Sequence, residues 1–288
     1  MRQFILLIGI LLMGGRAFGG RSFRATRTDP SVLRSQTPRI ETPAILTGIF
    51  EVRPTLATRK GNLSTENFYE VSWWLKSDKR LSFGESFFTA PGPNKSHSVS
   101  MGDGFLRYQA RDVKKDEVTG MTVSVDVRAN LPLSQASRDA GMLTALRSTV
   151  LIMMPITENV RFEFRNTPIL YLFKAAGHES SSGPVAHPVA ENRTSLGPVI
   201  NLSQSVVLMA PLNFSLMKYR HYRPGASHEG ELQPDLSFSP EVDWTVNPNL
   251  YLGVAFRTEG LMMRDQMGMI LSNTVGSGYL QFVMGLSF

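Results

Sequence analysis

The last residues of the chain alternate between two kinds of side chain, a pattern that few folds can accept. Side chains of an extended strand point alternately to opposite faces. One face of the final segment is apolar and consists of Leu280, Phe282, Met284, Leu286 and Phe288. The other face carries Gln281, Gly285 and Ser287 together with the larger Tyr279 and Val283. The chain is therefore predicted to end in a β-strand that presents one face to apolar surroundings.

This alternation and the terminal Phe288 resemble the C-terminal signature of Gram-negative outer-membrane β-barrels, a porin-like family. In that family the barrel assembly machinery reads the final strand. The resemblance therefore implies that Tyr279, Phe282 and Phe288 form the assembly signal and that this machinery is a partner. A soluble protein can also end on a buried strand, but rarely with phenylalanine at the last position. We expect an all-β fold, a transmembrane antiparallel up-and-down β-barrel of about 12 strands, in the outer membrane of a Gram-negative bacterium.

The N-terminus has the three parts of a secretory signal peptide. Arg2 gives a positive start, residues 4–13 form an apolar run, and Ala17-Phe18-Gly19 fits the small-x-small cleavage pattern. A membrane anchor is the alternative reading, but a transmembrane helix needs about 20 apolar residues. No run in this chain approaches that length. We therefore predict a signal peptide over residues 1–19.

Residues 20–43 are rich in Arg, Ser, Thr and Pro and show no periodicity. Such a composition buries too little apolar surface to fold, so we predict a disordered periplasmic arm. The arm contributes much of the formal net charge of +6, yet no nucleic-acid-binding motif accompanies it. The chain has no cysteine, which excludes disulfides and thiolate metal sites. An exported barrel of this kind must be stabilised by the pairing of its strands.

From residue 44 to residue 288 the chain divides into short segments separated by turn residues, as in a transmembrane barrel. In residues 121–128 (MTVSVDVR), for example, apolar and polar side chains alternate. A strand of a soluble sheet looks the same, so the number of such segments carries the argument. We predict strands at 44–56, 66–76, 80–90, 103–113, 119–130, 147–156, 159–173, 198–210, 213–223, 235–246, 249–258 and 277–288. Their even number places both ends of the chain in the periplasm.

The connections between these strands alternate in length. We expect tight turns at residues 77–79, 114–118, 155–158, 210–212 and 247–249. We expect long connections at residues 57–65, 91–102, 131–146, 174–197, 224–234 and 259–276. Outer-membrane barrels have short turns on the periplasmic side and long loops outside. The alternation follows from the strand assignment alone and supports it.

If the apolar faces contact lipid, the opposite faces line the barrel interior. The charged residues of those faces, which we predict to line the pore, are Glu51, Arg53, Glu70, Lys76, Arg107, Arg111, Asp126, Arg128, Arg161, Glu163, Arg165, Glu241, Asp243 and Arg257. Five of the arginines, in three strands, can form a basic ladder that favours anions. The alternative is that the acidic residues neutralise the ladder as ion pairs. The sequence leaves both interpretations open.

The third long loop differs from the others. Ala136, Ala140, Leu143 and Leu146 recur at helical spacing, and Ser134 or Ser137 can cap the start of a helix. General porins fold their third loop into the bore as a constriction, and this loop has the same ordinal position. A short helix that caps the rim or plugs the lumen is an equally acceptable interpretation.

The histidines do not form a known catalytic motif. His178-Glu179-Ser180 matches only part of the H-x-S-N-G context of the outer-membrane phospholipase family and lies in a predicted loop. His221 and His228 lie near Glu229 and Glu231, and we interpret them as a polar loop rather than a metal site. We therefore expect no enzyme activity, no cofactor and no metal.

The sequence favours a porin-like channel for passive diffusion of small hydrophilic solutes, with a preference for anions. The alternative function is a non-conducting barrel with a plugged lumen, whose outer loops bind a partner or a surface. Besides the assembly machinery, we expect outer-membrane lipids and lipopolysaccharide as partners and no nucleic acid. A homo-oligomer is left open.

Overall fold

The computed structural model describes residues 46–57, 63–91, 97–180, 183–258 and 278–287. The predicted signal peptide and periplasmic arm lie outside the described residues, as does Phe288. Among the described residues, no helix is long and apolar enough to cross a membrane.

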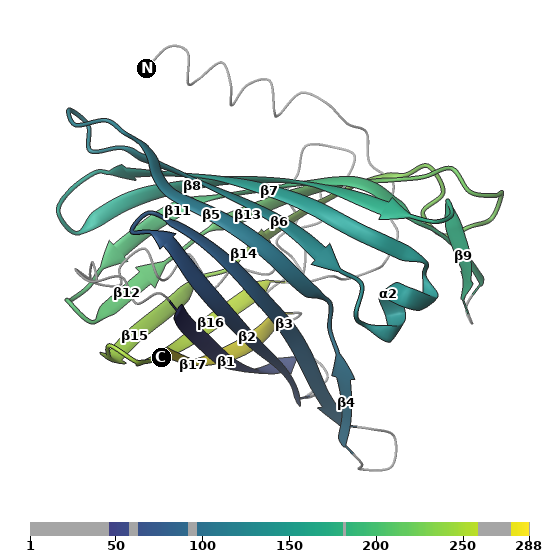
Figure 1. Cartoon of the computed structure of the whole chain (residues 1–288), viewed down its shortest axis with the longest axis horizontal. Coiled ribbons are helices and arrows are strands. Elements are labelled where there is room, and N and C mark those ends of the chain that lie inside the picture. The colour runs from purple at the N-terminus through teal and green to yellow at the C-terminus, as the bar shows by residue number, and fades with distance from the viewer. Residues whose placement is uncertain (1–45, 58–62, 92–96, 181–182, 259–277, 288) are drawn as a thin grey trace.

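The described residues form a closed antiparallel β-barrel with a wall of 12 strands (Figure 1). Around the barrel these are β1 (Leu46–Ala57), β2 (Leu63–Lys76), β3 (Lys79–Pro91), β5 (Gly104–Lys115), β6 (Thr122–Leu131), β7 (Met142–Pro155), β8 (Val160–Phe173), β11 (Pro188–Asn201), β12 with β13 (Val206–Met209, Leu212–Tyr219), β14 with β15 (Leu232–Phe238, Glu241–Asn247), β16 (Leu250–Thr258) and β17 (Gly278–Ser287). The predicted fold class is confirmed.

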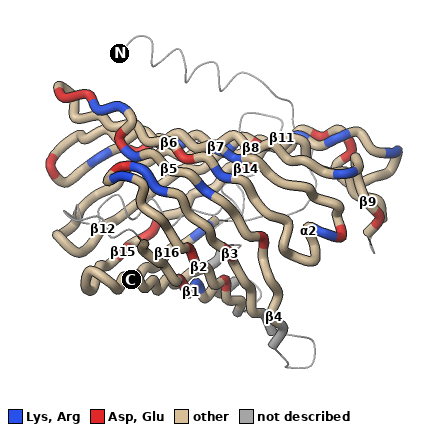
Figure 2. The backbone as a smooth tube through the Cα atoms, in the orientation of Figure 1, with Lys and Arg blue, Asp and Glu red and all other residues tan. Residues whose placement is uncertain are grey.

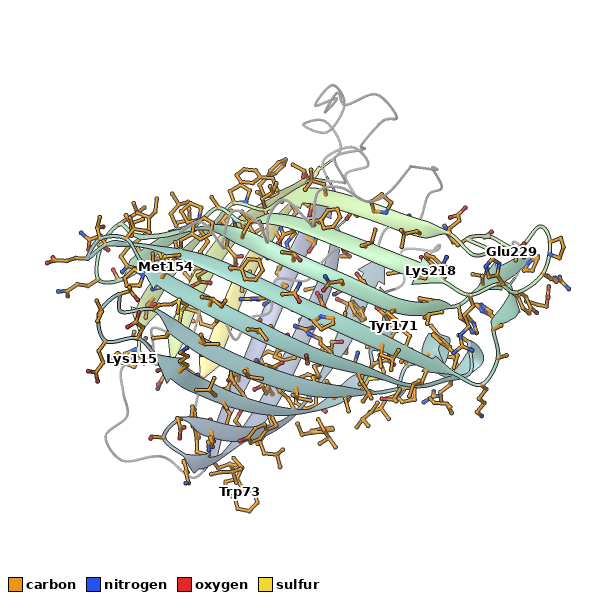
Figure 3. The ribbon with its side chains drawn as sticks, turned by 90° about the horizontal axis from the view of Figure 1, so that it is seen from above. Trp73, Lys115, Met154, Tyr171, Lys218 and Glu229 are labelled. Carbon is orange, nitrogen blue, oxygen red and sulfur yellow. The ribbon has the colours of Figure 1, made fainter. Side chains whose placement is uncertain are left out.

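The remaining elements lie at the end of the barrel that carries the long connections. They are β4 (His97–Met101), which pairs with the end of β3, a separate hairpin of β9 (Gly177–Ser180) and β10 (Gly183–Ala186), and α2 (Gln135–Asp139). Figure 3 shows the two ends: Lys115 and Met154 lie beside tight turns, and Lys218 and Glu229 lie at the opposite end. In outer-membrane barrels the end with long connections is the one that faces away from the cell.

The barrel closes where the last strand pairs with the first. Ile49 of β1 lies opposite Ser287 of β17, and Thr55 lies opposite Gln281. The Gln281 Nε2 group also donates to Thr55 Oγ1 at 3.1 Å. The C-terminal strand thus leaves no free sheet edge, which a hydrocarbon environment requires.

The two faces of the wall differ as the alternation predicts. Trp73, Val127 and Phe282 point outward and are 54%, 48% and 46% exposed, whereas Glu51 and Ser72 point inward and are fully buried. Figure 3 shows Trp73 projecting from the outer side of the wall. Trp73 and Trp244 are both exposed at the tight-turn end, where amphipathic rings favour the membrane interface. The outer face therefore has the composition of a lipid-contacting surface.

The turn predicted at residues 210–212 and the strand predicted at residues 198–210 are wrong. The segment at 210–212 is not a turn but an interruption within one wall strand, between β12 and β13. The tight turn lies instead at residues 202–205, where Leu202 N–H donates to the Val206 carbonyl at 2.9 Å. Residues 188–197, expected to be a loop, belong to β11.

Proline explains the misread turn. Pro211 has no N–H and cannot donate to a ladder, so it marks turns more often than strand interiors. Here the chain stays extended through Pro211, and Ala210 N–H donates to the Pro198 carbonyl at 3.2 Å. A side chain at Gly197 would collide with the Ala210 carbonyl, so this glycine permits the close approach. The two errors offset each other, and the strand count is unchanged.

The predicted helix is shorter than its apolar spacing suggests. Ser134 caps α2 by accepting the Ser137 N–H at 3.1 Å, as expected. The helix ends before Gly141, which adopts a φ of 68°, and Leu143 and Leu146 already belong to β7. Helix α2 has no buried residue and is tied to the start of β5 through Asp103, which accepts from Ser137 Oγ at 2.6 Å. The helix therefore caps the rim (Figure 1).

The lipid-facing assignment can be tested at Val127. Val127→Arg should lower the free energy of unfolding by about 2–4 kcal/mol, because a basic side chain near the middle of the hydrocarbon loses its hydration. Val127→Leu is the matched control and should have little effect. Urea unfolding in lipid vesicles, followed by tryptophan fluorescence, measures both. Equal unfolding midpoints for the two variants would contradict the assignment.

Candidate channel interior

A charged network covers the inner wall formed by β2, β3, β5 and β6. Glu70 lies between two guanidinium groups, 3.6 Å from Arg80 Nη2 and 3.3 Å from Arg107 Nη1. Arg107 also donates through Nε to Asp126, and Arg80 Nε donates to Gln109 at 2.7 Å. All four charged side chains are at most 8% exposed. On this wall, acidic and basic groups neutralise each other.

A second group joins β1 to β16, which lie on either side of β17 where the barrel closes. Arg53 donates to Glu51 through Nε at 2.9 Å and through Nη2 at 2.6 Å. Tyr251 of β16 donates its hydroxyl to the other oxygen of Glu51. Both charged residues are nearly inaccessible, so the pair ties the first strand to its neighbours and offers little charge to a solute.

The adjacent strand β15 presents acidic side chains. Glu241 and Asp243 both point inward and are 5% exposed. Among the described residues, neither carboxylate oxygen of Asp243 has a hydrogen-bond partner. Arg257 lies two strand positions further along the neighbouring strand β16 and is also 5% exposed. Two acidic side chains and one basic side chain thus face this part of the interior.

The inner wall of β7, β8 and β11 is basic. Arg147, Arg165 and Arg193 come from these three strands in turn and line one cavity together with Glu163 and Asn213. Figure 2 shows Lys and Arg distributed along β5 to β8. The cavity has a volume of about 70 Å³, which is room for several water molecules or a small anion.

Acidic partners hold the side chains around this cavity in place. Glu191 accepts from Arg193 Nε at 2.6 Å and from the Tyr171 hydroxyl at 2.7 Å. Arg161 donates to Glu163 at 3.1 Å. A carboxylate therefore holds Arg193 at the wall of the cavity, and a second ion pair involves Glu163, which also lines it.

The residues predicted to line the pore do not all occupy equivalent places. Arg111 packs its guanidinium over the Trp74 ring at 5.1 Å, and Arg128 packs over the Phe105 ring at 3.7 Å. Lys76 is exposed at the tight-turn end of β2. The five arginines of the predicted ladder are thus divided between ion pairs, aromatic rings and the cavity wall. A pore-lining role for the whole set stays a prediction.

Three interior arginines were not among the predicted residues: Arg80, Arg147 and Arg193. Arg193 fell in the segment 174–197, which was taken as a loop, and Arg147 was taken as the first residue of the strand predicted at 147–156. Arg80 was taken as the first residue of its strand. Strand alternation, applied with the correct boundaries, identifies all three.

Of the predicted assembly signal, Phe282 is 46% exposed on the outer face of β17. The backbone of Tyr279 pairs with Ala57 and Arg257. Phe288 lies outside the described residues. The recognition of this strand by the assembly machinery stays a prediction.

A small lobe at the outer rim contains the β9–β10 hairpin. The rings of His178 and His187 stack at 5.0 Å, with His178 Nδ1 and His187 Nε2 2.8 Å apart, and His187 also stacks on Phe173. Burial lowers the pKa of His187, and the neighbouring His178 and Arg220 act in the same direction, although a hydrogen bond to the Ala175 carbonyl opposes them. His228 pairs with Glu231 at 3.0 Å. No cluster of three metal-binding side chains occurs in the part of the chain described.

The network around Glu70 makes a prediction for stability. Glu70→Gln should lower the free energy of unfolding by about 1–3 kcal/mol, because two buried guanidinium groups lose a charged acceptor. Lys76→Gln, on the same strand but exposed, is the control and should have little effect. Urea unfolding in lipid vesicles gives both values. A Glu70 variant as stable as the wild type would show that the network contributes nothing.

The lobe should open as the pH falls. The pKa of His187 is lowered in the closed lobe, so protonation of His187 favours the open lobe. Neutral His187 stabilises the closed lobe fully above the ordinary histidine pKa of about 6.5, and this stabilisation is lost as the pH falls below it. Limited proteolysis at pH about 8 and about 5 should therefore cleave residues 175–187 faster at the lower pH. His187→Phe should remove this difference, and a difference that persists in the variant would contradict the assignment to His187.

No protein-family profile and no curated protein matches this sequence. Among solved structures, the chain is similar to the NanC porin, with 12% identity, a TM-score of 0.51, and coverage of 83% of this chain and 98% of NanC. It is also similar to the COG4313 outer membrane channel from Pseudomonas putida F1, with 11% identity, a TM-score of 0.56, and coverage of 84% and 95%. At such identities the likeness concerns the fold. The chain therefore has the fold of these outer-membrane barrels, a closed antiparallel barrel whose last strand pairs with its first.

Proposed function

We propose that the protein is a passive channel for small hydrophilic solutes, with a preference for anions. The observation that carries the proposal is the cavity lined by Arg147, Arg165 and Arg193. Guanidinium groups keep their charge at every physiological pH and present several donors to one carboxylate or phosphate. A row of such groups, of which Arg193 is held by Glu191, gives a hydrated anion a polar path along one wall.

The distribution of charge within the barrel supports this preference. The arginines of β7, β8 and β11 face an interior whose acidic residues Glu241 and Asp243 lie on β15. An anion is drawn to the basic wall and repelled from the acidic one. A charge on one side of a narrow aqueous space, with low-dielectric walls, acts more strongly than the same charge in bulk water.

The second candidate is a non-conducting barrel with a filled lumen. The network of Glu70, Arg80, Arg107 and Asp126 favours it, because these side chains are almost completely covered and pair with each other. In that case the function lies in the outer loops, and the rim lobe with helix α2 is the surface that binds a partner.

A catalytic role is not part of the proposal. In the His178-Glu179-Ser180 segment, His178 bonds to His187, and Glu179 pairs with Arg223 at 2.8 Å. Ser180 Oγ donates to the Gly183 carbonyl at 2.7 Å rather than to a histidine base. A nucleophile needs such a base within hydrogen-bond reach. The segment therefore supports a structural role in the hairpin.

The channel proposal is tested by recordings in planar bilayers under a salt gradient. The wild type should give stable conductance steps with a reversal potential of anionic sign. Arg147→Gln with Arg165→Gln should move the reversal potential toward zero or to cationic sign, because the cavity loses two positive charges.

Lys115→Gln removes one charge at the exposed tight-turn end and is the control, with a reversal potential close to wild type. Folding of each variant is checked by heat-modifiable gel mobility. Silence from a folded wild-type barrel would reject the channel and favour the filled lumen. A double variant with unchanged selectivity would reject the role of these arginines.

A further inference from the structure

The lipid-facing side of β8 and β11 carries a hydrogen-bonded polar cluster. Asn166 Nδ2 donates to Asn192 Oδ1 and to Thr194 Oγ1, both at 3.0 Å. The adjacent residues Thr167 and Glu191 point inward and are 3% and 4% exposed. Since neighbouring side chains of a strand point to opposite faces, Asn166, Asn192 and Thr194 lie on the outer face. The two asparagines are partly exposed there, and Thr194 is 7% exposed.

The cluster lies at the depth of the hydrocarbon. Asn166 and Thr194 are midway along strands of 14 residues each, opposite each other in the register. Apolar outward residues flank them on both strands: Leu170 is 44% exposed and Leu196 is 38% exposed. Polar groups at this depth are costly unless their hydrogen bonds are made, because lipid chains offer no donor or acceptor.

The cluster does not use all of its hydrogen-bonding capacity. Within the described part of the chain, the Asn192 amide nitrogen donates to no acceptor and Asn166 Oδ1 receives no donor. Another polar pair on the outer face behaves differently. Tyr69 donates to Glu85 at 2.7 Å, and Glu85 is only 7% exposed. The Tyr69 hydroxyl and the Glu85 carboxylate bond to each other, whereas the asparagines keep one free donor and one free acceptor.

The surface around the asparagines allows close approach. We call Ser148, Asn166, Pro168, Asn192 and Thr194 the asparagine patch. Ser148 lies on β7 beside β8, and like Pro168 and Thr194 it has a short side chain. Larger residues border the patch, including Val127 and Leu146, which are 48% and 45% exposed. Small residues between larger ones are the surface on which transmembrane elements associate.

We propose that the asparagine patch is the interface through which two copies of this chain associate side by side in the membrane. A two-fold axis along the membrane normal brings the same patch of each copy together. The free Asn192 Nδ2 group of each copy then donates to the free Asn166 Oδ1 atom of the other copy. The patch is therefore complementary to the same patch on a second copy, whereas lipid chains offer neither a donor nor an acceptor.

The test replaces the two asparagines and measures the oligomeric state. Native mass spectrometry of the protein in lipid nanodiscs should show dimers for the wild type. Asn166→Leu with Asn192→Leu should weaken dimerisation at least tenfold, which corresponds to about 1.4 kcal/mol. The same double variant should keep a wild-type or higher unfolding midpoint, because leucine suits the lipid face. Loss of the dimer together with loss of barrel stability would instead assign the cluster a structural role.

Two controls keep the result specific. Val242→Leu with Val254→Leu changes two paired residues of the outer face on β15 and β16 and should leave the dimer intact. Because the chain has no cysteine, Leu196→Cys at the border of the patch should give cross-linked dimers with a bismaleimide in vesicles, and Val254→Cys should not. A monomeric wild type at every protein-to-lipid ratio, or equal cross-linking at both positions, would overturn the proposal.

Discussion

The antiparallel pairing of β1 with β17 is the interaction on which the structure depends. Hydrocarbon offers no hydrogen bonds to backbone N–H and C=O groups, so a sheet in the membrane must have no open edge. The pairing of Ile49 with Ser287, and of the positions that follow, closes the wall. Once the wall is closed, every side chain lies either inside or outside, and the alternation along each strand assigns it. Closure of the wall therefore decides which residues face the membrane and which face the interior.

Inside the barrel, charge is divided unevenly around the wall. Around Glu70, acidic and basic groups neutralise each other, which fixes the geometry of β2 to β6 and leaves little net charge for a solute. On β7, β8 and β11, three arginines line a cavity, and Glu191 orients one of them, Arg193. The same ion-pair chemistry thus serves as structural filling on one side and, in the proposed channel, as a support for anion-binding groups on the other.

The sequence predicts the fold well because barrel strands obey a local rule. In β6 and β17 the alternation is strict, and the exposed Val127 and the buried Gln281 lie on the expected faces. The number of strands and the alternation of turn lengths follow from the same rule. The errors arise where local signals conflict with pairing. Pro211 looks like a turn residue, yet β11 pairs with β13 on one side of it and with β12 on the other, so the wall strand continues through it.

The interior was less accessible to prediction than the fold. Arg147 and Arg193 were missed because their strands were assigned too short at the outer end. Partners distant in the sequence cannot be read from a pattern: Glu70 is joined to Arg107 only because β2, β3 and β5 are neighbours. The outward Asn166 and Asn192 break the alternation of apolar residues, and a single sequence cannot tell such a break from a strand end.

The most direct test of a closed, water-filled barrel compares two neighbouring residues of β11. Ser195 lines the cavity and Leu196 points outward. Single variants Ser195→Cys and Leu196→Cys, in a chain without cysteine, can be treated in proteoliposomes with a charged, membrane-impermeant thiol reagent. The account predicts that Ser195→Cys reacts, faster with an anionic than with a cationic reagent, and that Leu196→Cys does not. An unreactive Ser195→Cys would show that water does not reach the interior and would contradict the channel.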